Sequence, residues 1–322
     1  MSLRSVLTPA VYHGLNKKPP FFEGWYYKLI SADERNKVAI IPGVILGNEA
    51  QAFLQVLDGV NGTSAYVKFP FEDFRADDRH FSIEIGDSHF DDRQLTLALN
   101  SPDCQLAGKV HLGPLNPWPV TWISPGIMGW YAWVPSMECY HGVLSFSHTL
   151  EGTLTLNGKE MDFTGGKGYI EKDWGQSFPS AWIWCQSNHF ANKDACLTAS
   201  VAIIPWRGNA FRGFIVGFWW EGKLHRFATY SGARIESLQI FDDHVDWVIK
   251  NRQHRLFLKA ARVQGGLLRG PTRLDMGQRV VETLNATVQV RLETLQGSLL
   301  FDEIGAHTGL EVMGDLARLL QT

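Results

Sequence analysis

The chain has 322 residues, of which 45% are hydrophobic and 20% charged, and a formal net charge of -3. This balance predicts a globular protein and excludes both a membrane-spanning helix, which needs ~20 apolar residues, and the basic field that attracts nucleic acid. The length exceeds one ordinary hydrophobic core and therefore predicts two domains.

The N-terminal segment, residues 1–18, has neither the residue order nor the cleavage site of a secretory signal. We therefore expect a cytoplasmic protein, with its four cysteines present as buried thiols.

Period-two alternation, typical of half-buried strands, dominates most of the chain. Phe81, Ile83 and Ile85 alternate with polar residues, and Asn157–Gly158 supplies the positive φ angles of a tight hairpin between residues 153–156 and 159–163. Further strands are predicted at 38–46, 51–57, 64–69, 95–99, 105–112, 197–204, 211–220, 223–230, 244–249, 255–263 and 286–295.

Two segments depart from this alternation. Between residues 113 and 135, prolines interrupt a series of tryptophans, so no long regular element is expected. This segment is interpreted either as a lid or interdomain wrap that contacts a ligand, or as a loop whose tryptophans plug a barrel mouth. Near the C-terminus, Leu316, Leu319 and Leu320 have the spacing of a short amphipathic helix.

An all-β fold of two tandem antiparallel β-barrels with a short C-terminal helix is therefore predicted. Closing a sheet into a barrel removes its exposed edges, and such a barrel can enclose one small ligand. Ala39–Pro42 and Ala202–Pro205 repeat the same four residues after similar aromatic segments, which favours duplicated halves. The expected domains are residues 1–164, including the loop 113–135, and residues 165–322.

Two acids at the start of the second half are candidate catalytic groups. In an extended strand, Tyr169, Glu171 and Asp173 share one face. Lys172 and Trp174 share the other. Neighbouring like charges in apolar surroundings would keep one carboxyl protonated near neutral pH, as a general acid requires. The alternative is that Lys172 or an arginine pairs with one acid while Asp173 caps a turn.

A second acid lies among aromatic residues near the N-terminus. Glu23 shares a predicted strand face with Trp25 and Tyr27. It is interpreted either as a catalytic acid or as a structural residue that accepts backbone N–H bonds or pairs with Lys28.

A third segment combines indoles with amides. Trp182, Trp184, Gln186, Asn188 and Phe190 align on one predicted strand face, which suits a ligand pocket. The alternative is a barrel core whose polar groups are satisfied by neighbouring backbone.

These segments resemble the tocopherol cyclase family. Phe21–Lys28 is similar to its Phe-Phe-Glu-Gly-Trp-Tyr motif, and Gly168–Phe190 to its Glu-Lys-Asn-Trp-Gly, Phe-Pro and Trp-x-Trp-x-Gln-x-Asn segment. Gly309–Val312 resembles a third block more loosely. Asp173 stands where the family has asparagine, which either adds an acid or exchanges one polar support for another. The lack of a plastid-type leader suggests a prokaryotic relative, whose substrate need not be a tocopherol precursor.

The resemblance implies two lipocalin-like barrels and cofactor-independent cyclisation of a prenylated hydroquinone, or a related isoprenoid lipid, to a chromanol. An acid protonates the alkene, tryptophan faces stabilise the tertiary cation by roughly 1 to 2 kcal/mol each, and the phenol oxygen captures it. Glu171 or Asp173 is the expected donor, with Glu23 in reserve. The expected substrate-binding residues are Trp25, Tyr27, Trp174, Trp182, Trp184, Gln186, Asn188 and Glu311, the last also a reserve acid.

Two alternatives stay open: a hydratase, in which water captures the same cation, and a non-catalytic lipocalin-like carrier of a prenyl lipid. A small hydrophobic substrate is the expected partner, without nucleic acid, cofactor, metal or obligate protein partner. The histidines lack zinc-type clustering, and His141 and His148 do not form a ligand pair by spacing. The basic stretch Lys250–Arg279 is interpreted as a solvated strand face or as a weak peripheral contact with an anionic membrane.

Overall fold

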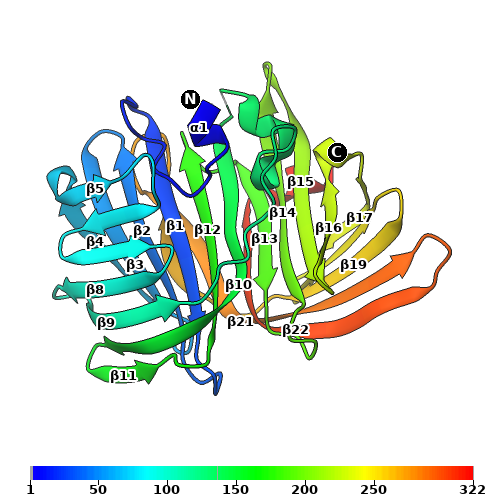
Figure 1. The fold of residues 1–322 in the computed structure, drawn as a ribbon. Helices are drawn as coiled ribbons and strands as arrows, with labels where there is room; N and C mark the ends of the chain where they lie inside the picture. Colours follow the sequence, from blue (N-terminus) through cyan, green and yellow to red (C-terminus); the bar gives the residue numbers. More distant parts are fainter. Residues whose placement is uncertain (1–2, 136, 322) are drawn as a thin grey trace. The chain divides into compact units, whose positions relative to one another are not determined.

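The computed structural model describes residues 3–135 and 137–321 (Figure 1). It is almost entirely antiparallel β-structure, which confirms the predicted class. The chain divides into two compact units, Met1–Phe178 with Gly266–Val280 and Pro179–Gly265 with Val281–Thr322. This division differs from the expected boundary between residues 164 and 165, because the strand that follows this boundary pairs with strands of the first unit.

The first unit contains a 12-stranded sheet in the order β4-β3-β2-β1-β12-β10-β9-β8-β7-β6-β5, with β11 paired to β10. Its strands are β1 (Phe21–Ile30), β2 (Lys37–Leu46), β3 (Ala50–Asp58), β4 (Thr63–Pro70), β5 (Phe74–Ala76), β6 (Ser82–Ile85), β7 (Ser88–Asp91), β8 (Gln94–Asn100), β9 (Gln105–Leu112), β10 (Cys139–Leu156), β11 (Lys159–Asp162) and β12 (Lys167–Gly175). Its helical turns are α1 (Leu3–Val6), η1 (Phe71–Asp73) and η2 (Gly126–Trp133), and it also includes β20 (Gly266–Gly270).

The second unit is built on nine strands in the order β16-β15-β14-β13-β22-β21-β19-β18-β17. Its elements are β13 (Ala181–Ser187), β14 (Cys196–Trp206), β15 (Asn209–Trp220), β16 (Lys223–Ala228), η3 (Thr229–Ser231), β17 (Arg234–Ile240), β18 (His244–Lys250), β19 (His254–Ala261), β21 (Gln278–Thr294), β22 (Leu299–Gly314) and α2 (Leu316–Leu320). The C-terminal helix is thus confirmed, whereas the N-terminal turn α1 was not predicted.

The two sheets share one topology. In each, four consecutive strands form a meander, and the first strand of that meander pairs with a strand from late in the same sheet. The repeated Ala-Ile-Ile-Pro segments occupy equivalent strands, β2 and β14, each beside the first strand of its meander. The internal repeat read in the sequence therefore reflects a duplicated strand order.

Closed barrels were predicted, and this is wrong. Among the described residues, no pairing joins the edge strands β4 and β5 of the first sheet, or β16 and β17 of the second. At both places a 3₁₀ turn, η1 or η3, separates the two edge strands along the chain. Neither sheet therefore has a hydrogen-bonded pairing between its two edges in the described part of the chain.

The predicted hairpin at Asn157–Gly158 is confirmed. It joins β10 to β11, with φ angles of 49° and 82° at the two turn residues. The segment 113–135 also matches its prediction, because its only helical element is η2, which is interrupted by non-helical φ and ψ angles at Gly129.

Replacing Gly158 with alanine should lower the free energy of unfolding by about 1–2 kcal/mol. No atom lies within 4 Å of the added Cβ, so the cost comes from the positive φ of 82° alone. Urea unfolding of Gly158→Ala and Gly158→Asn checks this, since asparagine tolerates that conformation and should lose less. Equal stability of the alanine variant and the wild type would contradict the prediction.

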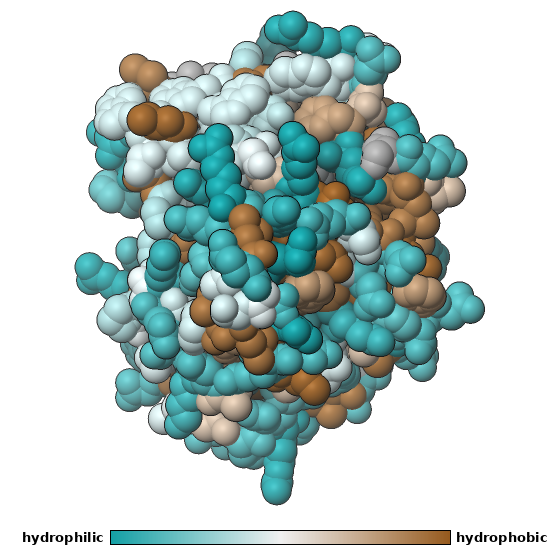
Figure 2. All heavy atoms as spheres, turned by 90° about the vertical axis from the view of Figure 1, so that its right-hand side faces the viewer, coloured by the Kyte–Doolittle hydropathy of each residue, from teal (hydrophilic) through white to brown (hydrophobic). Residues whose placement is uncertain are grey.

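The apolar core of the second unit lies on one side of its sheet and includes Ile183, Cys185 and Phe218. Its large exposed hydrophobic residues are Phe241, Val263, Val281, Leu299, Leu300, Ile304 and Leu320. Figure 2 shows a face on which hydrophobic groups are interspersed among hydrophilic ones. Across residues 3–135 and 137–321, no helix has the length and apolar character needed to cross a membrane.

Candidate functional site

Strand β12 presents Glu171 and Asp173 on one face, as its alternation predicted. The antiparallel neighbour β10 places His141 opposite Asp173 and Val143 opposite Glu171. Directly paired residues of antiparallel strands point to the same side of the sheet. The register therefore brings His141 to both acids, although it lies 32 positions from Asp173 in the sequence.

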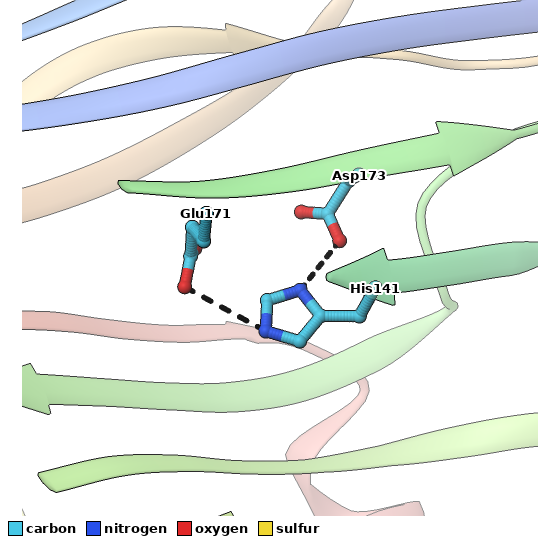
Figure 3. Close-up of side chains that lie close together, drawn as sticks. All are labelled: His141, Glu171 and Asp173. Carbon is cyan, nitrogen blue, oxygen red and sulfur yellow. Dashed lines mark hydrogen bonds and ion pairs between the residues drawn. The ribbon is translucent and has the colours of Figure 1, made fainter. Parts of the chain in front are cut away.

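Figure 3 shows the imidazole of His141 between the two carboxylates. Its Nδ1 lies 2.7 Å from Oδ1 of Asp173, and its Nε2 lies 3.6 Å from Oε2 of Glu171. The hydroxyl of Tyr169 donates a hydrogen bond to the same oxygen of Glu171. The side chains of Glu171, His141 and Asp173 are 7%, 14% and 28% exposed, so this His141 cluster is shielded, and Asp173 is its most accessible member.

The His141 cluster holds a proton. Burial alone would lower the pKa of His141, but the charges of Asp173 and Glu171 and the hydrogen bond to Asp173 outweigh it and raise the pKa to about 9. The ring is therefore an imidazolium at neutral pH. The alternation along β12 predicted the two carboxylates as holders of the proton, and the structure adds the imidazole of His141.

Stability should depend on pH through His141. Folding raises its pKa from 6.5 to about 9, so between these values the folded chain keeps a proton that the unfolded chain loses. The stabilisation is complete below pH 6.5, declines as the pH rises, and is lost above pH 9. Urea unfolding of the wild type and His141→Gln should show this slope in the wild type alone. In Asp173→Asn, NMR titration should give a lower His141 pKa, and an unchanged value would contradict the assignment.

The same three side chains could also hold a metal ion, because their ligand atoms all lie within 4.8 Å of one another. The spacing of histidines along the sequence gave no sign of this, since the ligands come from two strands. Both ring nitrogens of His141 face carboxylates, and the ring carries a proton that a metal ion would have to displace. A metal ion bound here would therefore have to compete with the shared proton for His141.

A second charged cluster lies on the opposite face of β12. The Nζ atom of Lys172 is 2.5 Å from Oε1 of Glu23 and 2.8 Å from Nδ1 of His13, and all three side chains are buried. The ammonium also donates hydrogen bonds to the carbonyl oxygens of Pro9, at 2.9 Å, and Val11. The backbone N–H of His13 lies 3.0 and 2.9 Å from the two oxygens of Glu23. This Lys172 cluster fixes the N-terminal segment to the sheet.

The charges of the Lys172 cluster support one another. Burial would raise the pKa of Glu23, but Lys172 and His13 outweigh it and hold that pKa below its ordinary value. Burial lowers the pKa of Lys172 to about 8, against the attraction of Glu23. Burial and the charge of Lys172 lower the pKa of His13, as expected for a neutral ring that donates from Nε2 to the carbonyl of Ser5.

Glu23 therefore matches the structural alternative, with Lys172 as its partner in place of the expected Lys28. A carboxylate held by a buried ammonium is a poor proton donor. The alternative in which Lys172 neutralises Glu171 or Asp173 is wrong, because Lys172 points to the other face.

Three predicted substrate-binding aromatics, Trp25, Tyr27 and Trp174, share the face of Lys172. The indole N–H of Trp25 donates to a backbone oxygen of the N-terminal segment at 3.2 Å, and Trp174 stacks on His13 with ring centroids 4.3 Å apart. Tyr27 is fully buried against other aromatic rings. The structure thus separates all three from Glu171 and Asp173 by the thickness of the sheet, and their binding role stays a prediction.

In the second unit, Trp182, Trp184 and Gln186 share one face of β13, as predicted, and all three are buried. The residues between them, Ile183 and Cys185, belong to the apolar core. The indole-and-amide face therefore lies on the side of the sheet opposite this core.

Glu311 of β22 lies on the same face, opposite Trp184. Its Oε2 accepts a hydrogen bond from Nε1 of Trp182 at 2.5 Å. The next strand, β21, places Glu282 opposite Glu311, and Glu282 is 1% exposed. The structure thus brings Glu311 and two predicted tryptophans together and adds an acid that the sequence did not single out.

The predicted alignment ends before Asn188, because β13 stops at Ser187. The Oδ1 atom of Asn188 lies 2.8 Å from Nδ1 of His189, and Phe190 belongs to the apolar core. Alternation no longer applies once the strand has ended, so Phe190 does not continue the face of Trp184. The substrate-binding roles of this set stay predictions.

Comparison with known proteins identifies the family. A profile described as tocopherol cyclase-like matches residues 98–314, more than half of the chain. The chain belongs to the tocopherol cyclase-like family. The match confirms the resemblance and includes the whole His141 cluster, whereas the motif at Phe21–Lys28 lies outside it.

One relative of this tocopherol cyclase-like chain is the chloroplastic tocopherol cyclase of Zea mays. It is 26% identical over 151 residues, which are 45% of this chain and 31% of the plant enzyme. The chain therefore matches about a third of the length of this curated relative.

Two solved structures share the fold. CghA is 10% identical with a TM-score of 0.59, over 92% of this chain and 89% of CghA. Kievitone hydratase from Nectria haematococca is 12% identical with a TM-score of 0.53, over 96% and 95% of the two chains. At sequence identities this low, the comparison shows a shared fold and nothing about function.

Proposed function

We propose that this tocopherol cyclase-like chain is an acid–base enzyme that cyclises a prenylated hydroquinone, or a related isoprenoid lipid, to a chromanol without a cofactor. The observation that carries the proposal is the shielded imidazolium of His141 between Glu171 and Asp173. Two carboxylates and a ring that share one proton can supply it to a substrate and take it back, which an isomerisation requires.

In the proposed reaction, Glu171 protonates the trisubstituted alkene and becomes a carboxylate. The phenol oxygen attacks the tertiary cation, a C–O bond forms, and the phenol proton returns to the cluster, so that atoms and charge balance. Glu171 is the preferred donor because it is the least exposed member of the cluster, so its proton is the best shielded from water.

His141 supplies the proton to Glu171 in this scheme. The 3.6 Å between Nε2 and Oε2 is longer than a hydrogen bond, so the two groups must approach each other before transfer. Asp173 holds Nδ1 at 2.7 Å and stabilises the imidazolium, the role that an orienting carboxylate has beside a catalytic histidine.

The proposal is tested by incubating the purified protein with prenylated hydroquinones of different tail length and separating the products by chiral chromatography. A chromanol of one handedness, formed only with active protein, supports cyclisation. A tertiary alcohol would instead indicate hydration, in which water captures the cation. The same racemic background with and without protein would leave only the function of a lipid carrier.

A further inference from the structure

A tight turn at residues 120–125 of the first unit carries two large apolar side chains at its tip. The backbones of Thr121 and Ser124 exchange hydrogen bonds of 3.1 and 3.2 Å across the turn. This pairing leaves Trp122 and Ile123 as the two central residues. Trp122 is 67% and Ile123 86% exposed.

The local fold does not explain these residue types. The centre of a two-residue turn favours glycine, asparagine, aspartate or serine, which either adopt its backbone angles readily or hydrogen-bond to it. Indole and sec-butyl groups that stay largely in water gain little from folding. Val120 and Trp130 are also exposed, at 38% and 44%. From Val110 to Met137 the sequence contains no aspartate, glutamate, lysine or arginine.

The tip is held in a fixed orientation. The indole of Trp133 stacks on that of Trp122, with centroids 6.4 Å apart and planes 9° from parallel. The Nε1 atom of Trp133 also donates a hydrogen bond of 3.1 Å to the carbonyl of Trp122. Hydrogen bonds within the segment therefore satisfy several backbone N–H and C=O groups of the turn. This lowers the free-energy cost of moving the turn into an apolar medium.

We propose that the tip formed by Trp122 and Ile123 inserts into the interfacial layer of a lipid bilayer. Tryptophan is favoured at that depth, and an uncharged, preorganised turn enters with little ordering cost. A stable protein interface buries roughly 800 Å² on each partner. Two protruding side chains can bury far less surface than this, which favours lipid over a protein partner. This inference is independent of the proposed chemistry, although a membrane contact would suit a lipid substrate.

Insertion of this tip is a different mode of membrane binding from the electrostatic contact of the basic stretch Lys250–Arg279 with an anionic membrane. An uncharged tip should bind neutral vesicles and resist salt, whereas basic residues need anionic lipid and lose their attraction as salt screens it. Binding to phosphatidylcholine vesicles at low and high salt separates the two modes.

The test measures co-sedimentation of the full chain with phosphatidylcholine vesicles. Ile123→Asp should weaken partitioning at least about tenfold, equivalent to about 1.4 kcal/mol, because it leaves the stack of Trp122 on Trp133 intact while adding a charge. The matched control is Leu299→Asp, at another exposed position (55%), which should bind like the wild type. Urea unfolding verifies that both variants are folded.

Three results would overturn the proposal. They are a wild-type chain that does not bind neutral vesicles, equal binding by Ile123→Asp and the wild type, and binding that requires anionic lipid and disappears in high salt.

Discussion

Replacing Lys172 with methionine should lower the free energy of unfolding by about 3–5 kcal/mol. The ammonium is fully buried, lies 2.5 Å from a carboxylate oxygen of Glu23, and donates to backbone oxygens of the N-terminal segment. Methionine occupies a similar volume but leaves the buried charge of Glu23 without its partner. Urea unfolding at neutral pH measures the loss.

Two controls separate the lost ion pair from lost packing. The double variant Glu23→Gln with Lys172→Met removes both charges and should recover a substantial part of the stability. Lys250→Met breaks a 3.7 Å pair with Glu236 in which both side chains are partly exposed, and it should cost less than about 1 kcal/mol. A Lys172→Met variant as stable as the wild type would show that the Lys172 cluster does not hold the N-terminal segment.

Replacing Glu171 with glutamine should lower chromanol formation at least about a hundredfold, the usual scale for losing a general acid. The amide keeps the shape and the acceptor oxygen for Tyr169 but cannot deliver a proton to the alkene. Single-turnover rates with a prenylated hydroquinone measure the effect. The urea unfolding curve should lose only the part of the stability that the charge of Glu171 gives to protonated His141, so unfolding cannot account for a hundredfold loss of turnover.

Asp173→Asn and Glu160→Gln complete this comparison. Asp173→Asn should reduce turnover through the lower pKa of His141, and it should shift the pH profile as well as the rate. Glu160 is an exposed residue of β11, so Glu160→Gln should act like the wild type. Full activity in both Glu171→Gln and Asp173→Asn would remove the proposed proton source.

The faces of single strands were predictable from the sequence. Alternation placed Glu171 with Asp173, Glu23 with Trp25, and Trp182 with Trp184, and each prediction is confirmed. It failed at Phe190 because β13 ends before that residue. Period-two alternation is a local property of extended backbone, so it holds only as far as the strand continues.

The partners of the acids were not predictable. His141 reaches Glu171 and Asp173 through the register of β10 on β12, and Lys172 reaches Glu23 through the pairing of β12 with β1. These strands are separated by long stretches of chain, and no spacing rule links them. His13 belongs to a segment without regular structure, where no periodic signal exists.

The sequence by itself determined the β class, the duplicated order, the family and the side of each strand on which an acid lies. These properties depend on residue type and on short-range alternation, which a chain carries without any partner. The tertiary structure decided that the sheets stay open, that Glu23 is bound in an ion pair, and that His141 shares its proton with Glu171 and Asp173. Such outcomes depend on which distant strands pair and in what register, and that choice belongs to the folded chain as a whole.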